Sequence, residues 1–499
     1  MSELLSHLEY QAIAKRLQVP TQSFIDGRFC DSSTGKTYAT VNPATGEEIA
    51  QVAACEAEDV DKAVAAARRA FDSGEWSQRH PAERKEVLKA FGELVLKHAD
   101  ELAVMECIDS GKPIQDCVTI DVPEFVNTVN WHAESIDKIY DQTAPVGSEA
   151  MAMIVREPIG VVGAVLPWNF PMLMLSWKIA PALAAGCSVI VKPAEQTSLT
   201  SLRIAELASQ AGIPDGVFSV ITGGGAEVGE PLGRHVDVDM VTFTGSTVTG
   251  RRFLNYSSES NLKKVVLELG GKNPCVVLND ASNLDKVAEH VLSAAFWNMG
   301  ENCSAASRLI VRSEVKPALM EEILAQLKSW KMGDPLNPEN QLGAMIDKRQ
   351  FDKVCSYLEQ GKQKGYEVLA GGNSQDGAYI EPTIFEGVDN QDAIAQEEIF
   401  GPVLAVITVD SVEEALRIAN ETSYGLAASV FTSNNGQALR AARAIKAGTV
   451  TVNCFGEGDL TTPFGGYKQS GFGGRDNSVH AHDQYTELKT IWVDLTHDL

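Results

Sequence analysis

Short apolar runs alternate with helical patterns between residues 160 and 271 of this chain. The runs have the length of buried strands, and periodic apolar residues between them predict helices at 177–185 and 199–211. Strands joined by helices favour a mostly parallel, doubly wound sheet, so we predict an α/β fold. The predicted strands are Gly160–Leu166, Ser188–Pro193, Phe218–Ile221, Met240–Phe243 and Val265–Gly271.

A second α/β series follows, and we place a domain boundary near Gly270-Gly271. A chain of 499 residues is too long for one small core, which favours two or three domains. A strand at 485–494 must pair with its own sheet or with a partner's edge. The other predicted elements are strands within 20–55 and at 151–158, 275–278, 309–311 and 403–407, and helices within 57–112 and at 123–139, 284–296, 315–330 and 351–364.

Charge and cysteine usage exclude several classes of protein. The formal net charge is -25 and the pI is about 4.8, which argues against nucleic acid or an anionic membrane as partner. The nine cysteines form no C-x-x-C pair, so we expect reduced thiols in the cytoplasm and no zinc site. The N-terminus lacks an apolar signal core, and no apolar run is long enough to span a membrane.

One cysteine, Cys303, lies in a polar, glycine-containing segment between a predicted helix and a predicted strand. A thiol at such a junction can be partly exposed and close to backbone N–H donors, as an attacking thiolate requires. The alternative is a small, buried, unreactive thiol.

Polar residues follow two of the predicted strands, at the edge where doubly wound sheets bind ligands. Asn169 lies between Pro167 and Pro171, so its amide either faces a developing oxyanion or caps a rigid turn. Lys192 and Glu195 fit the two ribose hydroxyls of a dinucleotide, or they form a solvated surface pair.

Two further motifs follow strands. Gly245 and Ser246 open a helix and suit a pyrophosphate, although the pattern is not the G-x-G-x-x-G fingerprint. Glu268 lies within an apolar strand, where burial would raise its pKa toward that of a general base; the alternative is a paired edge-strand carboxylate. The segments 397–402 and 463–466 either contact a ligand or only pack against the rest of the protein.

Seven motifs occur in a fixed order: Pro-Trp-Asn-Phe-Pro (167–171), Lys-Pro-x-Glu (192–195), Phe-Thr-Gly-Ser-Thr (243–247), Glu-Leu-Gly-Gly-Lys (268–272), Gly-Glu-Asn-Cys (300–303), Glu-Glu-Ile-Phe-Gly-Pro (397–402) and Pro-Phe-Gly-Gly (463–466). In this order they resemble the NAD(P)-dependent aldehyde dehydrogenase superfamily over about residues 20 to 495. The tail segments 465–471 and 486–492 look most similar to bacterial enzymes acting on γ-glutamylamino-, ω-amino- and guanidino-aldehydes in polyamine breakdown.

The resemblance implies three catalytic residues. Cys303 would attack the aldehyde, the Asn169 amide and the Cys303 backbone N–H would hold the oxyanion, and Glu268 would activate water to hydrolyse the thioester. The reaction needs no metal. The polar residues Glu301 and Asn302 before the nucleophile depart from the family's usual pattern and leave substrate choice open.

The resemblance also implies a cofactor site. Lys192 and Glu195 would bind the adenosine ribose, and a carboxylate beside the 2′-hydroxyl should repel a 2′-phosphate, which favours NAD over NADP. The remaining cofactor residues implied are Trp168, Gly245, Ser246, Glu398 and Phe400.

The substrate tunnel implied by family position is aromatic, with acids near its mouth. Glu124 and Glu457, with Asp459 as a further candidate, would attract a cationic ω-amino group. If these acids are solvated rim charges instead, an arylacetaldehyde such as indole-3-acetaldehyde, or an aliphatic aldehyde, would fit. The implied lining residues are Glu124, Trp131, Phe170, Met174, Trp177, Phe455, Glu457 and Phe464.

The family fold implies a Rossmann-like NAD-binding domain (1–138 and 159–270), an α/β catalytic domain (271–470) and a β oligomerisation arm (139–158 and 471–499). We expect a homo-oligomer, with a tetramer favoured over a dimer. A non-catalytic binding relative would lack one of the three catalytic residues, and a coenzyme A-acylating enzyme would lack the general-base glutamate; neither loss occurs here.

Overall fold

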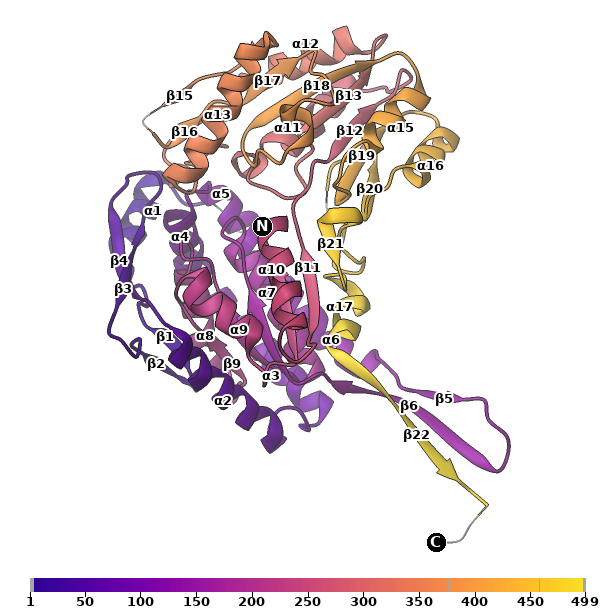
Figure 1. The fold of residues 1–499 in the computed structure, drawn as a ribbon. Helices are drawn as coiled ribbons and strands as arrows, with labels where there is room; N and C mark the ends of the chain where they lie inside the picture. Colours follow the sequence, from indigo (N-terminus) through magenta and orange to yellow (C-terminus); the bar gives the residue numbers. More distant parts are fainter. Residues whose placement is uncertain (1–3, 376, 457, 497–499) are drawn as a thin grey trace.

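The computed structural model describes residues 4–375, 377–456 and 458–496. Figure 1 shows two α/β units, each built around its own sheet, with a long β arm projecting from the lower unit. Within the described ranges, no helix is long and apolar enough to cross a membrane.

The first unit contains an eight-stranded sheet with the order β2-β1-β9-β8-β7-β10-β11-β21. The five strands from β9 to β11 are parallel, whereas β1, β2 and β21 are antiparallel to their neighbours. The strands are β1 (Ser23–Ile25), β2 (Arg28–Cys30), β7 (Val161–Val165), β8 (Ser188–Lys192), β9 (Phe218–Val220), β10 (Met240–Thr244), β11 (Lys264–Glu268) and β21 (Gly471–Phe472).

Both faces of this sheet are buried, which explains why its strands are uniformly apolar. Val162 and Ala164 face one hydrophobic core, whereas Val161 and Val165 face a second core on the other side. The helices packed in the first core are α3 (Pro81–Lys97), α4 (Ala99–Ser110), α6 (Val122–Ser135), α7 (Pro171–Ala185) and α8 (Leu199–Gln210). Those of the second core are α2 (Ala57–Ser73), α9 (Glu230–Arg234) and α10 (Thr247–Ser258).

The second unit contains a seven-stranded sheet with the order β14-β17-β18-β13-β12-β19-β20, parallel except for the edge strand β14. Its strands are β12 (Pro274–Val277), β13 (Arg308–Arg312), β14 (Glu367–Ala370), β17 (Thr383–Glu386), β18 (Val403–Val409), β19 (Ala427–Phe431) and β20 (Thr449–Val452). Its helices are α11 (Leu284–Phe296), α12 (Lys316–Leu327), α13 (Lys348–Lys364), α14 (Ala393–Gln396), α15 (Val412–Asn420) and α16 (Asn435–Ala444).

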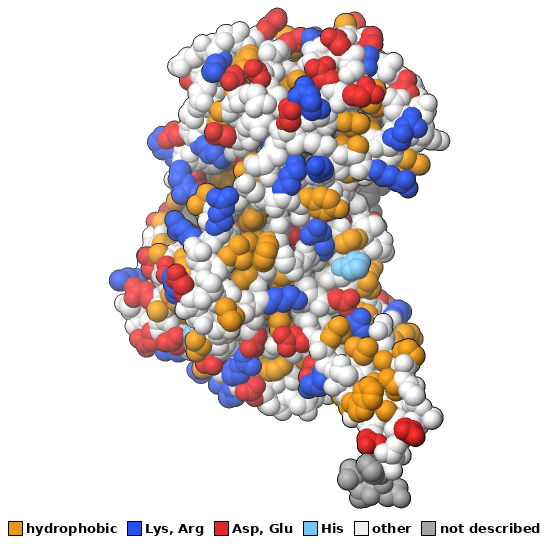
Figure 2. All heavy atoms as spheres, turned by 45° about the vertical axis from the view of Figure 1, so that its right-hand side comes forward, with side chains coloured by type: hydrophobic (Ala, Val, Ile, Leu, Met, Phe, Trp, Pro, Cys, Tyr) orange, Lys and Arg blue, Asp and Glu red, His pale blue; other side chains and the backbone are white. Residues whose placement is uncertain are grey.

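The arm is an antiparallel sheet in which the C-terminal strand β22 (Thr486–Asp494) pairs along its length with β6 (Ala150–Pro158), which also pairs with β5 (Gln142–Ala144). The terminal strand thus pairs within its own chain. Leu488, Ile491 and Trp492 on β22 are exposed, and Figure 2 shows apolar side chains gathered on the projecting arm.

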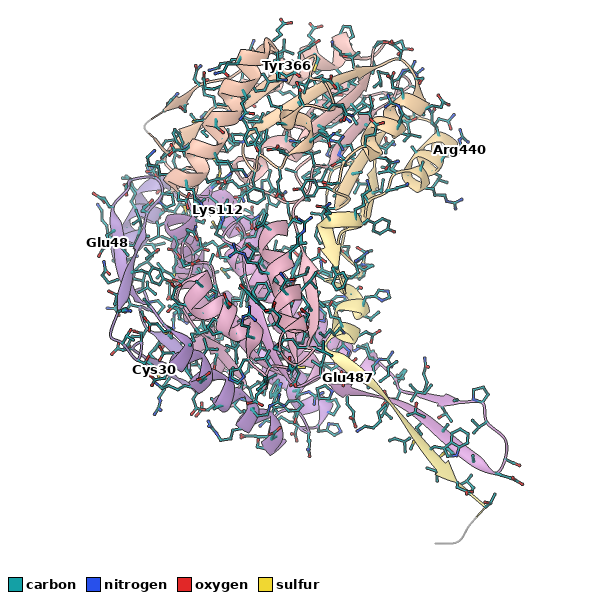
Figure 3. All side chains as sticks on the ribbon, viewed as in Figure 1. Cys30, Glu48, Lys112, Tyr366, Arg440 and Glu487 are labelled. Carbon is teal, nitrogen blue, oxygen red and sulfur yellow. The ribbon has the colours of Figure 1, made fainter. Side chains whose placement is uncertain are left out.

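The remaining elements are short. They are the helices α1 (His7–Ala14), α5 (Ile114–Asp116) and α17 (Ser478–Gln484), the hairpin of β3 (Thr37–Val41) and β4 (Glu48–Ala53), and the hairpin of β15 (Ser374–Gln375) and β16 (Tyr379–Ile380). Lys112, between α4 and α5, lies near the boundary between the two units (Figure 3).

The topology confirms the doubly wound α/β fold expected from the sequence. One predicted helix boundary differs from the structure. The helix expected at 177–185 begins about a turn and a half earlier, at Pro171. A proline is well tolerated at the first helical position, because its missing N–H would have had no intrahelical acceptor there. Three residues, 168–170, separate Pro167 from the first residue of the helix. Asn169 is one of them and lies just outside the helix.

Candidate active site

The motifs of the first unit converge because their strands are parallel. β7, β8, β10 and β11 run side by side in the same direction. Asn169, Lys192, Gly245 and Glu268 each lie at or just beyond the carboxyl end of one of these strands, so all four occupy one edge of the sheet. This is the edge at which doubly wound sheets bind their ligands.

Cys303 reaches this edge from the second unit, on the segment between α11 and β13. The segment begins with a tight turn in which Asn298 and Met299 adopt left-handed conformations, with φ of 51° and 55°. The Asn273 side chain donates hydrogen bonds to the carbonyls of Cys303 (2.8 Å) and Ala305 (3.0 Å) and so fixes the segment after the turn. The sulfur belongs to a half-buried residue, as a thiol open to a small substrate must.

Two asparagines join the Cys303 segment to the first sheet. The Asn169 side chain donates to the Glu301 carbonyl over 2.9 Å, and the Asn298 side chain donates to the carbonyls of Asn169 and Glu301, both over 3.1 Å. One N–H of the Asn169 amide is used in this way, and an amide has a second. The orientation of that second donor is set by the same hydrogen bonds.

A cavity of about 430 Å³ brings the candidate catalytic groups together. Its wall contains Asn169, Glu268 and Cys303, which come from three different segments of the chain. Other residues assigned from the sequence also line it, namely Trp168, Met174, Gly245, Ser246, Glu398 and Phe400.

Glu268 is a buried carboxyl whose oxygens make no hydrogen bond of normal length and angle with the described residues. Burial raises the pKa of Glu268 well above its usual value, and repulsion from Asp476 adds to the rise. Lys178 and Arg475 oppose it. Lys178 and Asp476 themselves form a fully buried ion pair, with 2.6 Å between Nζ and Oδ2.

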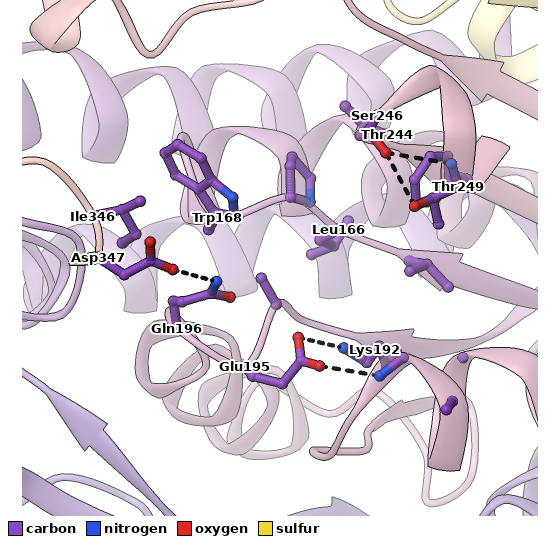
Figure 4. A pocket seen from close by; sticks show the side chains of 18 of the residues that line it. Leu166, Trp168, Lys192, Glu195, Gln196, Thr244, Ser246, Thr249, Ile346 and Asp347 are labelled. Atoms are coloured by element: carbon purple, nitrogen blue, oxygen red, sulfur yellow. Dashed lines mark hydrogen bonds and ion pairs between the residues drawn. The ribbon is translucent and has the colours of Figure 1, made fainter. Parts of the chain in front are cut away.

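A second cavity of about 760 Å³ adjoins the first and shares Trp168, Gly245 and Ser246 with it. Figure 4 shows the Lys192 ammonium beside the Glu195 carboxylate, over 3.1 Å. The other Glu195 oxygen accepts the Gly225 N–H over 3.0 Å, so the carboxylate is fixed at the cavity wall. Burial lowers the pKa of Lys192, and Glu195 opposes that shift.

Gly245 and Ser246 form the junction between the two cavities. Ser246 is the N-cap of α10 and accepts the Thr249 N–H over 3.3 Å. A Cβ atom at Gly245 would lie 2.6 Å from the Phe243 ring, so this position requires glycine. The first turn of α10 thus directs unbonded backbone N–H groups toward an anion placed at the junction.

Glu398 and Phe400 are held by a helix of the second unit. The Glu398 carboxylate accepts the Gly271 N–H over 2.9 Å, and burial raises the pKa of Glu398. From α13, Lys353 donates to the Glu398 carbonyl over 2.9 Å and Gln350 donates to the Ile399 carbonyl over 3.1 Å. The Phe400 ring packs edge-on against Trp168, with 5.2 Å between ring centroids.

The implied substrate residues are spread more widely. Met174 lines the Cys303 cavity, while Trp177 and Phe464 pack against each other at 5.2 Å and Phe170 packs against Trp297 at 5.1 Å. The others lie on separate elements: Glu124 on α6, where it accepts from the Asn127 side chain, Trp131 on the same helix against His132, Phe455 after β20, and Asp459 in the following loop. Glu457 lies outside the described residues.

Sequence reasoning missed the groups that hold the site in place. Lys178, Asp476, Asn298, Gln350 and Lys353 belong to no motif that stands out from single-sequence patterning. One feature of the sequence pointed to Lys178: it is a charged residue in a helix whose other residues are nearly all apolar. No cluster of three or more His, Cys, Asp or Glu residues suited to a metal occurs in the described part of the chain.

Comparison with known proteins gives consistent matches. The model of the aldehyde dehydrogenase family matches residues 29–491. Aminoacetaldehyde dehydrogenase of Pseudomonas aeruginosa is 64% identical over 494 residues, which cover 99% of this chain and 100% of that protein.

Two solved structures superpose closely. γ-Glutamyl-γ-aminobutyraldehyde dehydrogenase of Burkholderia cenocepacia has a TM-score of 0.96 and 48% identity, covering 98% of this chain and 100% of that one. A mutant of the indole-3-acetaldehyde dehydrogenase of P. syringae, in complex with NAD+ and IAA, has a TM-score of 0.97 and 46% identity, covering 99% and 100%. These matches confirm the resemblance carried by the seven motifs, and the chain belongs to the aldehyde dehydrogenase family.

Proposed function

We propose that this chain oxidises an aldehyde to a carboxylic acid with NAD, through a thioester on Cys303. One observation carries the proposal: a soft nucleophile, an amide donor and a buried carboxyl line a single cavity, which continues into a second, larger one. A small molecule in the first cavity would contact the thiol, while the second has room for most of a dinucleotide.

In the first half of the reaction, the Cys303 thiolate adds to the aldehyde carbonyl and the carbonyl oxygen becomes an oxyanion. The second N–H of the Asn169 amide stabilises that charge, because its partner N–H is already fixed on the Glu301 carbonyl. NAD, when bound, supplies the two-electron acceptor that conversion of the adduct into a thioester requires.

In the second half, Glu268 removes a proton from water, and the resulting hydroxide attacks the thioester carbon. The thiolate leaves, and the carboxylic acid is released. A carboxyl with a raised pKa is a stronger base than an ordinary one once it is deprotonated, which suits this role. Glu268 lines the Cys303 cavity, in which the water would lie.

The larger cavity fits the adenosine half of the cofactor. Lys192 and Glu195 offer a donor and an acceptor for the ribose hydroxyls, and Ser246 and Gly245 would lie beside the pyrophosphate. Glu398, Phe400 and Trp168 would then hold the nicotinamide half. The fixed Glu195 carboxylate favours NAD, because a 2′-phosphate there would meet a like charge.

The three largest sheets suggest three separate functions. We assign cofactor binding to residues 1–138 and 159–270, catalysis to 271–470, and assembly to the arm segments 139–158 and 471–499. Most of the first sheet falls in the first of these assignments, and the second sheet lies wholly in the second. Strand β21, from the C-terminal segment, closes the edge of the first sheet and so ties the arm to the cofactor unit.

The substrate we propose is an ω-amino- or γ-glutamylamino-aldehyde of polyamine catabolism. The 64% identity to an aminoacetaldehyde dehydrogenase and the structural match to a γ-glutamyl-γ-aminobutyraldehyde dehydrogenase support this class. Glu124, half-buried on α6, is the carboxylate that we propose for the ammonium group, and it lies outside the set of residues that line the Cys303 cavity. The match to an indole-3-acetaldehyde dehydrogenase keeps arylacetaldehydes as the second candidate.

Replacing Glu268 separates the two halves of the reaction. Glu268→Gln keeps the thiol and the amide donor but lacks a base, so we expect one rapid equivalent of NADH per Cys303 and then a steady rate about 10²–10³-fold below wild type. Stopped-flow absorbance at high enzyme concentration measures both phases. Cys303→Ala should give neither phase, and a full steady rate from Glu268→Gln would exclude the assigned base.

Replacing Lys178 and replacing Asp476 should shift the pH dependence of kcat in opposite directions. Glu268 is active when deprotonated, so activity is lost as the pH falls through its raised pKa. Asp476→Asn removes a repulsion, lowers that pKa and moves the acid limb of kcat to lower pH, whereas Lys178→Met moves the limb to higher pH. The double variant should return toward wild type. Limbs that stay in place, or that move in the same direction, contradict this electrostatic account.

Substrate and cofactor choice are measured together on a panel of 4-aminobutyraldehyde, a γ-glutamylated amino-aldehyde, indole-3-acetaldehyde and hexanal, each with NAD and NADP. We expect kcat/KM at least about tenfold higher for the amino-aldehydes and for NAD. Glu124→Gln should raise KM for 4-aminobutyraldehyde alone, whereas Glu134→Gln, farther along α6, should change nothing. A preference for indole-3-acetaldehyde would select the second candidate.

The exposed apolar side chains of β22 lead us to propose that the arm packs against a second copy of the chain, in a homo-oligomer for which we favour a tetramer. Light scattering of the full chain at micromolar concentration should give a multiple of 53.7 kDa. Trp492→Glu should lower that mass without changing the Cys303 site. A wild-type chain that elutes at the mass of one copy contradicts the assignment.

A further inference from the structure

A group of buried ionisable side chains contacts the segment that follows Asn169 and has no part in the reaction as proposed. Lys112 is its only cation, and its carboxyls are Glu106, Asp116 and Asp121. The Lys112 Nζ lies 2.7 Å from Asp121 Oδ2, and both side chains are 1% exposed. We name these four residues the Lys112 cluster.

The Lys112 ammonium also lies against an aromatic ring. Its Nζ is 4.1 Å from the centroid of Phe170, the residue that follows Asn169 in the chain. A cation that is removed from water attracts an aromatic ring more strongly than an exposed one does, so Lys112 restrains the position of the Phe170 ring. The Phe170 ring in turn packs against Trp297, the residue that precedes Asn298.

A second contact from the same cluster reaches the residue two positions beyond Phe170. Both carboxyl oxygens of Glu106 accept the Met172 N–H, over 3.3 and 3.2 Å. The first turn of α7 has no side-chain cap of its own, so this carboxyl satisfies one of its unbonded N–H groups. The cluster therefore holds the chain at Phe170 and at Met172, immediately after Asn169.

Packing alone does not account for four buried ionisable groups. Taking them out of water is costly, and an apolar set of the same volume would fill the space at no such cost. Burial raises the pKa of Glu106 to about 8 and that of Asp116 to about 7, which favours the neutral, protonated forms of these two carboxyls. Burial alone would lower the pKa of Lys112, but Asp121 and Glu106 outweigh it, so the ammonium stays charged beside the ring.

We propose that Lys112 is a positioning residue for Asn169: by fixing Phe170, it sets the direction of the amide that stabilises the oxyanion. The path is short, because Phe170 is joined covalently to Asn169, and Trp297 is joined to Asn298, whose side chain bonds the Asn169 carbonyl. This inference rests on the proposed role of Asn169 in catalysis.

The test is a double-mutant cycle between Lys112→Met and Asn169→Ala. Asn169→Ala alone should lower kcat about 10²–10³-fold. Lys112→Met alone should lower kcat about 10- to 100-fold, because a displaced donor loses much of its effect, while the Kd for NADH stays within twofold. In the Asn169→Ala background, Lys112→Met should cost less than about threefold, since there is no amide left to misdirect.

Two further variants control for charge balance and for the loss of a lysine that does not contact Phe170. Lys112→Met leaves Asp121 without its cation, so Lys112→Met/Asp121→Asn restores charge balance; its kcat should stay low, because the cation over Phe170 is still missing. Lys85→Met is the matched control, since Lys85 pairs with Asp137 (3.2 Å) and Glu134 (3.5 Å) beside α6 but does not contact Phe170. It should leave kcat unchanged.

The outcomes distinguish a failure of the role proposed for Asn169 from a failure of the role proposed for Lys112. If Asn169→Ala has little effect, the proposed oxyanion donor is wrong and the role of Lys112 falls with it. If Asn169→Ala is severe but the two losses multiply, Lys112 does not act through Asn169 and the inference is overturned. Recovery of kcat in Lys112→Met/Asp121→Asn would also overturn it, because charge balance alone would then explain the loss.

Discussion

Two hydrogen bonds, from the Asn169 side chain to the Glu301 carbonyl and from the Asn298 side chain to the Asn169 carbonyl, join the two halves of the candidate active site. Asn169 comes from the edge of the first sheet, while Asn298 and Glu301 belong to the segment that carries Cys303. A third bond, from Asn298 to the Glu301 carbonyl, fixes that segment itself. The left-handed turn at Asn298 and Met299 is the backbone strain that this arrangement requires, and such strain typically occurs at functional sites.

Buried ionisable side chains determine the electrostatics of the site. Glu268 has neither a hydrogen-bond partner of normal geometry nor an adjacent cation among the described residues, and burial and Asp476 both disfavour its ionised form. The positive charges of Lys178 and Arg475 oppose this rise in the pKa. The pKa of Glu268 is thus set by a balance between burial, Asp476 and these two cations. In the Lys112 cluster, the buried ammonium contacts both Asp121 and the Phe170 ring, and we propose that it acts on the position of Asn169.

The sequence was informative where function and local structure coincide. Asn169, Lys192, Gly245 and Glu268 follow apolar strands directly, so the rule that ligands bind at the carboxyl ends of parallel strands was sufficient to bring them together. Cys303 stood out because it interrupts a helix-to-strand connection with polar residues.

Contacts across long separations were not predictable in the same way. Lys178 and Asp476 are 298 positions apart, and nothing in the local pattern of either residue indicates the other. The α13 side chains that hold Glu398 and Phe400 belong to an ordinary amphipathic helix. The early start of α7 was missed, although a proline at the first helical position favours a helix. The substrate residues could not be assigned from the sequence, because aromatic side chains such as Trp177 and Phe464 pack equally well in a hydrophobic core.

The central claim is that one ligand path joins the Lys192–Glu195 cavity to the Cys303 cavity. A crystal structure of the full chain with NAD tests it most directly. The account predicts adenosine ribose hydroxyls on Lys192 and Glu195, and a nicotinamide ring between Phe400 and Cys303. A dinucleotide bound outside these cavities, or one whose nicotinamide ring does not reach the cavity of Cys303 and Glu268, would contradict it.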